Sequence, residues 1–370
     1  MNIKKLILKT SIVTILLLAL LLVLSPLIAL FLSPKLSKHV YQELSFRVIS
    51  GNELQNPSSN EVLIQKAIDY TRTNLWAVTD IPPYEGTPFD CLTIGIGWCD
   101  YHARVFCRLL SIKGIHARYD FLMDKDGVSP HTIAEVYLKG RWRAIDPYFS
   151  LIYYKDGKEW ARLEEVTPQL ISKLPRVSIM MQDKDAYNNF MDFTARIFPL
   201  PRAPTRSDDF VKDRHIFDFM ADAYVNVFGL NFAYWYQDIF LKRQIHEIKV
   251  PVERLWYEAR NYDLYQRTQK AEVLYREIIV NYSDSNYYDK TAFFLSLLLM
   301  RQERYEEARE VLNKLLIKKS HTAWRDYANF YLALCYEKLG NFRNAIYYYK
   351  LAREIKIYSD CLDHLRQLSG

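Results

Sequence analysis

The chain has 370 residues, half of them hydrophobic, and a formal net charge of +6 at pH 7. This length suits two or three domains rather than one core. The mild positive charge is spread along the chain without the basic block that follows nucleic-acid phosphates, so we predict no nucleic-acid partner. Five cysteines are too few for a disulfide framework, and their spacing from the histidines offers no zinc site. No metal or cofactor is predicted.

Residues 1–34 are predicted to form an N-terminal membrane anchor. No charged residue lies between Lys9 and Lys35. As a helix this run would span about 37 Å, more than the roughly 30 Å hydrocarbon core of a bilayer. A cleaved signal peptide is the alternative, although its apolar region is usually shorter. Lysines flank the run on both sides, so the charge rule for membrane orientation is nearly balanced. The short amino-terminal tail is expected on the cytoplasmic side, which places the bulk of the chain outside the cytoplasm.

Residues 35–160 are predicted to form an α+β domain in which helices precede an antiparallel meander. The periodicity and the turn signals give the expected elements. These are helices over 61–76 and 98–112, separated by the prolines at 82, 83 and 88, and strands over 115–123, 131–138 and 141–145.

Three polar residues of this domain suit nucleophilic acyl transfer. Cys99 stands at the start of the second helix, where backbone N–H groups and the helix dipole favour a thiolate. With a two-residue turn at Lys139-Gly140, Ile133 opposes Asp146, and Asp146 becomes a diagonal neighbour of His131, about 7–8 Å away between Cα atoms. A hydrogen bond between the two side chains would then fix the imidazole tautomer. A three-residue turn would place Asp146 on the opposite face.

Plainer interpretations of the same region stay open. Cys99 can be a buried structural thiol, as we expect for Cys107 two turns along the same helix. A disulfide between Cys91 and Cys99 would block the nucleophile. His102 is expected to be a surface or packing residue, and His116 has no obvious carboxylate partner.

The segments 97–99, 114–119 and 131–147 resemble the transglutaminase-like superfamily in their order and spacing. The resemblance covers about a quarter of the chain. It implies a papain-like core with Cys99 as nucleophile, His131 as general base and acid, and Asp146 as the residue that orients the imidazole. It also implies an acyl-enzyme formed from a peptide or amide bond, with hydrolysis favoured over cross-linking because water needs no second binding site.

Two features of the resemblance do not determine which residues would contact the substrate. Members of the superfamily often carry an aromatic residue two positions after the histidine, where this chain has Ile133. In some members a tryptophan donates a hydrogen bond to the oxyanion, and Trp76 and Trp98 are the candidates here, without a choice between them.

Residues 161–255 are predicted to be a helical connecting region. The prolines at 199, 201 and 204 mark a linker or domain edge. The aromatic-rich stretch over 216–241 contains three aspartates, which argue against a second membrane span. A buried helical hairpin is expected there, with a helix at the membrane surface as the alternative.

Residues 256–370 repeat with a period of 37, which links Ala271, Ala308 and Ala345 and several aromatic and leucine positions. Small residues at a fixed position let two helices approach closely, so stacked helix–turn–helix units are predicted. The motifs around Ala308 and Ala345 resemble tetratricopeptide repeats, whose usual length is about 34. A plain helical bundle is the alternative.

The sequence therefore predicts a papain-like, transglutaminase-like α+β core between an N-terminal transmembrane helix and a C-terminal all-α repeat domain. The predicted protein is a membrane-anchored cysteine hydrolase or acyltransferase that acts on a peptide or protein substrate, while its repeats bind a protein partner. The alternative is a non-catalytic scaffold of the cell envelope.

Overall fold

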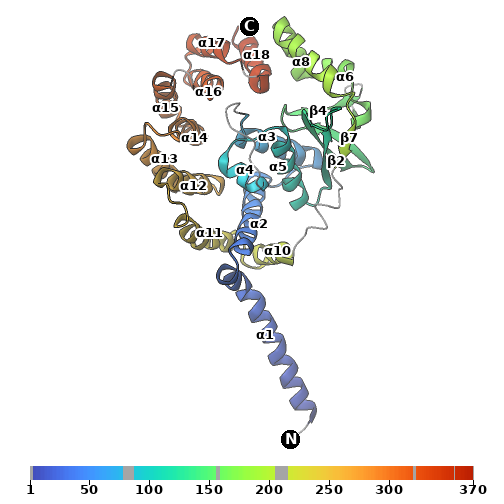
Figure 1. The fold of residues 1–370 in the computed structure, drawn as a ribbon, viewed down its shortest axis with the longest axis vertical. Coiled ribbons are helices and arrows are strands. Elements are labelled where there is room, and N and C mark those ends of the chain that lie inside the picture. Colours follow the sequence, from blue (N-terminus) through green and yellow to red (C-terminus); the bar gives the residue numbers. More distant parts are fainter. Residues whose placement is uncertain are drawn as a thin grey trace. The chain divides into compact units, whose positions relative to one another are not determined.

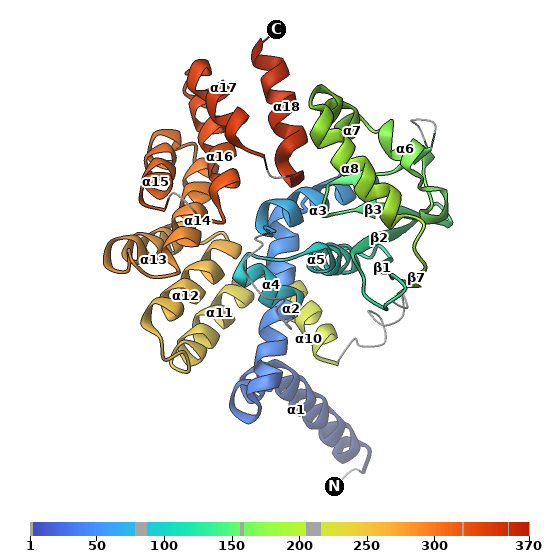
Figure 2. The same cartoon turned by 45° about the horizontal axis from the view of Figure 1, so that its top comes forward.

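The computed structural model describes residues 3–77, 87–155, 159–204, 216–319, 322–353 and 355–369. Its contacts divide the chain into two compact units. The first combines residues 1–55 with 211–247, and the second combines residues 56–210 with 248–370. The described part of the first unit is helical, whereas the second contains a small sheet and a long series of helices (Figure 1, Figure 2).

The first unit is built around a helix that the sequence pattern did not predict. Its helices are α1 (Ile3–Leu32), α2 (Pro34–Glu53), α10 (Ile216–Phe228) and α11 (Leu230–Ile245). Helix α2 packs against the other three, although its buried face includes polar residues. The buried Arg47 is satisfied by the buried Glu43 of the same helix and by the partly exposed Asp222 of α10, at 2.6 Å each.

Helices α10 and α11 correspond to the predicted hairpin over 216–241, with Gly229 at the turn. The hairpin is buried on one side only, because Tyr224 and Tyr236 are buried whereas Val227 and Trp235 are exposed. In α1, the apolar side chains from Ile12 to Leu24 are exposed. Among the described residues, no helix combines the length and the apolarity needed to cross a membrane. The membrane anchor therefore stays a prediction.

The second unit begins with the predicted α+β elements. In chain order they are α3 (Asn60–Asn74), α4 (Pro88–Ile94), α5 (Cys99–Ile112), β1 (Ala117–Leu122), β2 (His131–Leu138), β3 (Arg141–Asp146) and β4 (Leu151–Ile152). The sheet has the antiparallel order β4-β3-β2-β1-β7, and the predicted meander is confirmed. Of the prolines expected to separate the helices, Pro88 instead begins α4 after the N-cap Thr87, and those at 82 and 83 lie outside the described residues.

Short elements follow the sheet and complete the first half of this unit. They are β5 (Tyr154–Lys155), β6 (Glu159–Trp160), η1 (Leu163–Glu165), α6 (Pro168–Ser172), α7 (Pro175–Ile179), η2 (Met180–Gln182), α8 (Lys184–Ile197) and β7 (Arg202–Pro204). The prolines near 200 were expected to mark a linker or a domain edge. Pro204 lies in β7, which pairs with β1 at the sheet edge, where proline is tolerated, and this stretch of the second unit ends at residue 210.

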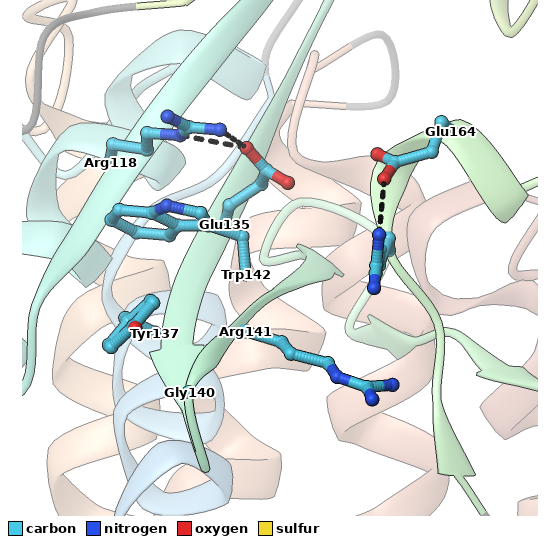
Figure 3. Close-up of a pocket in the computed structure, with 8 residues that line it drawn as sticks. Arg118, Glu135, Tyr137, Gly140, Arg141, Trp142 and Glu164 are labelled. Carbon is cyan, nitrogen blue, oxygen red and sulfur yellow. Dashed lines mark hydrogen bonds and ion pairs between the residues drawn. The ribbon is translucent and has the colours of Figure 1, made fainter.

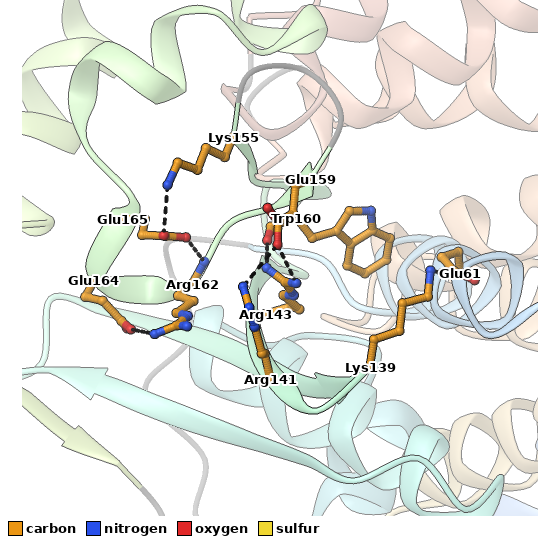
Figure 4. Close-up of polar contacts among 10 residues, drawn as sticks. All are labelled: Glu61, Lys139, Arg141, Arg143, Lys155, Glu159, Trp160, Arg162, Glu164 and Glu165. Carbon is orange, nitrogen blue, oxygen red and sulfur yellow. Dashed lines mark hydrogen bonds and ion pairs between the residues drawn. The ribbon is translucent and has the colours of Figure 1, made fainter.

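A two-residue turn fixes the register of β2 and β3. Lys139 and Gly140 both have positive φ, at 51° and 80°, which is the signature of a type I′ hairpin turn. Leu138 opposes Arg141, and Ala134 opposes Ile145, as predicted. Ion pairs surround this hairpin: Figure 4 shows Lys139 reaching Glu61 of α3 at 2.9 Å and Arg143 reaching Glu159 at 2.8 Å.

Helix pairs of a 37-residue repeat make up the rest of the second unit. The first helices of the pairs are α12 (Pro251–Leu264), α14 (Tyr288–Arg301) and α16 (Arg325–Lys338), the second helices are α13 (Thr268–Asn281), α15 (Tyr305–Lys318) and α17 (Phe342–Leu351), and α18 (Ile355–Ser369) follows. Successive first helices begin 37 residues apart, so the predicted period is confirmed. Ala271, Ala308 and Ala345 are fully buried, as expected for close helix contacts. The tetratricopeptide resemblance stays a prediction.

The last helix returns to the first half of the unit. Helix α18 packs against α7. Its Asp360 pairs with Arg72 of α3 and with Arg176 of α7, both at 2.9 Å. Both ends of the helical series therefore contact the α+β part, because α12 packs against α4.

Each pair turns at the same repeat position. Gln266, Glu303 and Gly340 are 37 residues apart and have φ of 57°, 60° and 76°. The next N–H donates to the carbonyl five residues back, as from Arg304 to Leu299 at 3.0 Å. This is the Schellman end of a helix, whose left-handed residue is usually glycine. Only the third of these turns carries glycine.

We expect Glu303→Gly to raise the free energy of unfolding by about 1 kcal/mol, because the left-handed conformation costs a non-glycine residue roughly 1–2 kcal/mol. The matched control is Gly340→Ala, which should lower it by a similar amount. Urea denaturation followed by circular dichroism measures both. A destabilised Glu303→Gly variant would show that the exposed Glu303 side chain contributes more than the turn conformation costs.

Candidate active site

Cys99 is the first residue of α5. Its N-cap, Trp98, places no side-chain acceptor over the first-turn N–H groups. All five cysteines are free thiols, so the Cys91–Cys99 disulfide is not formed. Cys99 is half-buried, whereas the other four are buried, and burial raises the pKa of Cys91 to about 12. Cys99 is thus the most accessible of the five thiols.

His131 and Asp146 form a buried pair. Nε2 of His131 lies 2.7 Å from Oδ2 of Asp146, and the two residues are 2% and 1% exposed. The backbone N–H groups of Tyr148 and Phe149 donate to the other carboxylate oxygen at 3.0 Å. Tyr153 donates its hydroxyl to Oδ2 at 3.4 Å. These bonds hold the Asp146 carboxylate in one orientation, directed at the imidazole.

Cys99 lies near enough to the same imidazole to help raise its pKa. Because Nε2 bonds Asp146, Nδ1 is the ring nitrogen free to receive a proton from the thiol. Burial alone would lower the pKa of His131, but the charges and hydrogen bonds of Asp146 and Cys99 outweigh it and raise the pKa to about 10. The structure thus pairs His131 with Asp146 and places Cys99 near the imidazole.

Aromatic side chains surround the imidazole of His131. The ring of Phe149 lies 5.5 Å from it, that of Phe193 lies 5.6 Å away, and that of Tyr148 lies 6.2 Å away. Ile133, where the superfamily often has an aromatic residue, is fully buried. The aromatic rings beside the imidazole therefore come from the β3–β4 turn, through Tyr148 and Phe149, and from α8, through Phe193. Sequence analysis missed Phe193, because nothing local indicates that α8 reaches β2.

His102 is a further residue of the site region, and sequence analysis did not predict its hydrogen bonds. It is completely buried, with Nδ1 2.8 Å from the carbonyl oxygen of Trp98 and Nε2 3.2 Å from that of Leu75. Carbonyl oxygens only accept, so both bonds form together only when both ring nitrogens carry hydrogen. Of the two roles expected for His102, surface or packing, the packing role is confirmed. Its position one turn after Trp98 was the available signal.

The other candidate side chains lie outside this site. His116 is exposed. Glu135 bonds Arg118 at 2.6 Å instead of reaching His131. Of the two tryptophans considered as oxyanion donors, Trp98 is half-buried and Trp76 is buried among aromatic rings of the repeats.

A pocket of about 280 Å³ opens on the β2–β3 hairpin away from the three site residues (Figure 3). The Arg118 guanidinium lies 4.2 Å over the Trp142 ring and is held by Glu135. Arg162 likewise contacts Glu164, at 3.5 Å. Because these charged side chains pair with one another, we assign them a structural role in the sheet and not a ligand-binding role.

Comparison with protein families gives one match. Residues 50–147 match the model of the transglutaminase-like superfamily, and this segment contains Cys99, His131 and Asp146. The chain therefore contains a transglutaminase-like domain, which accounts for about a quarter of its length. No curated protein and no solved structure matched the chain in the corresponding comparisons.

We expect Asp146→Asn to destabilise the protein in a pH-dependent way. The folded-state pKa of His131, about 10, lies above the ordinary value of 6.5. The protonated pair therefore stabilises the fold fully below about pH 6.5, and this contribution is lost as the pH rises towards 10. At pH 6 the free energy of unfolding of the variant should be about 3 kcal/mol lower than that of wild type. The difference should disappear by about pH 10.

Urea denaturation at pH 6, 8 and 10 measures this difference. Asparagine keeps an oxygen that can accept from Tyr148 and Phe149, so the substitution removes mainly the charge. If the difference in free energy of unfolding between variant and wild type stays constant across this pH range, Asp146 does not raise the pKa of His131.

Proposed function

We propose that the protein is a cysteine hydrolase or acyltransferase that cleaves peptide or amide bonds, with Cys99, His131 and Asp146 as its catalytic triad. The observation that carries this proposal is the buried imidazole of His131, which bonds the Asp146 carboxylate at 2.7 Å and has Cys99 near enough to help raise its pKa. The transglutaminase-like domain supports it, since that superfamily generally has cysteine peptidase or acyltransferase activity.

The geometry supports a two-step reaction. With its raised pKa, His131 holds as an imidazolium the proton that the thiol gives up, and the thiolate attacks the substrate carbonyl carbon. Backbone N–H groups in the first turn of α5 are placed to stabilise the oxyanion, helped by the positive end of the helix. The imidazolium then gives its proton to the leaving amine as the C–N bond breaks, which leaves an acyl group on Cys99.

The second step releases the acyl group. The now neutral imidazole takes a proton from a water molecule, whose oxygen attacks the thioester, and the thiolate leaves. Asp146 stabilises the imidazolium in both steps. An amine in place of water would give transamidation, and we favour hydrolysis because water needs no second binding site.

The flanking segments supply the proposed context. The uncharged run between Lys9 and Lys35 supports an N-terminal membrane anchor with the bulk of the chain outside the cytoplasm. The helical repeats support a protein partner, because stacked helix pairs commonly bind proteins. The same repeats motivate the second candidate function, an envelope scaffold in which the transglutaminase-like domain binds without catalysis.

We expect Cys99→Ala to lower the turnover of p-nitrophenyl acetate at least about 10³-fold, because the nucleophile is lost. Cys107→Ala, eight residues along the same helix, is the control and should retain turnover. Release of p-nitrophenolate is followed by absorbance. Iodoacetamide at pH 7 should label Cys99 before any other cysteine.

Two results would contradict the proposal. One is turnover that is equal in the Cys99→Ala and wild-type proteins. The other is labelling of folded Cys99 no faster than labelling in denatured protein. If a Cys99→Ala strain also kept its phenotype while surface changes in the repeats abolished it, the scaffold function would be supported.

A further inference from the structure

The first helices of the repeat pairs are buried on nearly all sides. In α14, buried residues run without interruption from Thr291 to Leu299. Its successor α15 buries only Ala308, Leu312 and Leu315, which lie along one face. A helix that is apolar all round contacts neighbours on every side. Helices α12, α14 and α16 therefore contact a second layer besides their partner helices.

That layer is the α+β part of the same unit. The ring of Trp76, which follows α3, lies 5.0 Å from Phe293 of α14 and 4.9 Å from Tyr327 of α16. Tyr327 also donates its hydroxyl to the carbonyl of Ala77 at 3.1 Å. Gly95, which ends α4, lies so close to α14 that an added Cβ would overlap the Phe294 ring. The two parts are in direct contact.

Arg260 of α12 joins the two parts by hydrogen bonds. It is 1% exposed, and its Nε donates to the carbonyl of Leu92 at 3.1 Å. One terminal nitrogen donates to both the backbone and the side-chain oxygen of Asn74, at 3.3 and 3.1 Å. The other pairs with Asp263 at 3.0 Å, and the guanidinium lies 4.2 Å over the Phe294 ring. One side chain thus holds the end of α3 and the last turn of α4.

The residues held in this way lead directly to Cys99. Trp76 and Ile96 form a parallel bridge: Trp76 donates to the carbonyl of Gly95 at 3.1 Å, and Gly97 donates to that of Trp76 at 3.0 Å. The two ring nitrogens of His102 contact the carbonyl of Leu75, which precedes this bridge, and the carbonyl of Trp98. A continuous set of hydrogen bonds therefore runs from α12 to the residue before Cys99.

We propose that the repeats act within the chain to position the catalytic cysteine, with Arg260 and Tyr327 as positioning residues. The first helices of the repeats hold the segment that follows α3 and the segment that follows α4, which pair with each other just before α5. They thereby fix the position of the Cys99 thiol and of the first-turn N–H groups. This inference rests on the proposed function. It also means that the face formed by α12, α14 and α16 is used internally, so a protein partner would bind the second helices.

The test uses two substitutions that keep the fold. Arg260→Lys keeps the charge beside Asp263 but loses the planar fork that reaches Leu92 and Asn74 together. Tyr327→Phe removes only the hydroxyl that bonds Ala77. The matched controls are Arg254→Lys on the same helix α12 and Tyr347→Phe at an exposed position of α17.

We expect kcat for p-nitrophenyl acetate to fall about 10-fold in Arg260→Lys and about 3-fold in Tyr327→Phe, because small displacements of a nucleophile are costly. KM should stay within twofold of wild type. The alkylation rate of Cys99 by iodoacetamide should fall in parallel across pH 6–9. Both controls should behave as wild type, and thermal melting should show that each variant is folded at the assay temperature.

The outcomes separate the two proposals. If wild-type Cys99 reacts no faster than an unfolded thiol, the proposed catalytic function fails. If wild-type Cys99 is reactive and Tyr327→Phe matches wild type in kcat and alkylation, the positioning role is overturned. The Tyr327→Phe result decides on its own if Arg260→Lys does not fold.

Discussion

The buried guanidinium of Arg260 is the most completely hydrogen-bonded of the contacts between the two halves of the larger unit. Removing this charge from water costs several kcal/mol, so it is tolerated only where its hydrogen bonds are satisfied together. Its acceptors come from the end of α3, from α4 and from its own helix, with Asp263 as counter-ion. Asp263 in turn accepts from Tyr275 and pairs with Arg301. The burial of this network requires the α+β part and the repeats to fold against each other.

The candidate active site depends on a different and more local constraint. The type I′ turn at Lys139-Gly140 sets the register that brings His131 beside Asp146, and the start of α5 brings Cys99 near the imidazole. Two of the three residues are thus placed by a hairpin and one by a helix that the repeats hold. A transglutaminase-like domain of this kind needs neighbours to complete its surroundings, as the contact of Phe193 with His131 also shows.

Sequence patterns predicted what depends on neighbours along the chain. The strands of the meander, the turn at Lys139-Gly140 and the 37-residue period all follow from local alternation, glycine placement and helical spacing. Helix α2 was missed because its buried face carries polar residues such as Arg47, which is satisfied by Asp222 from a distant segment. The hydrogen bonds of His102 were missed for the same reason, since its bond to Leu75 joins residues 27 positions apart. Local periodicity does not record such contacts.

The attachment of the helical series at both ends has a consequence for how this architecture can vary. Helix α12 is fixed at one end by Arg260, and α18 is fixed at the other by Asp360, which pairs with Arg72 and Arg176. An open solenoid gains or loses whole modules without penalty, because each module contacts only its neighbours. Here an extra 37-residue module would carry Asp360 away from both arginines. The copy number is therefore set by the span that the series must bridge, and length changes are confined to the connecting turns.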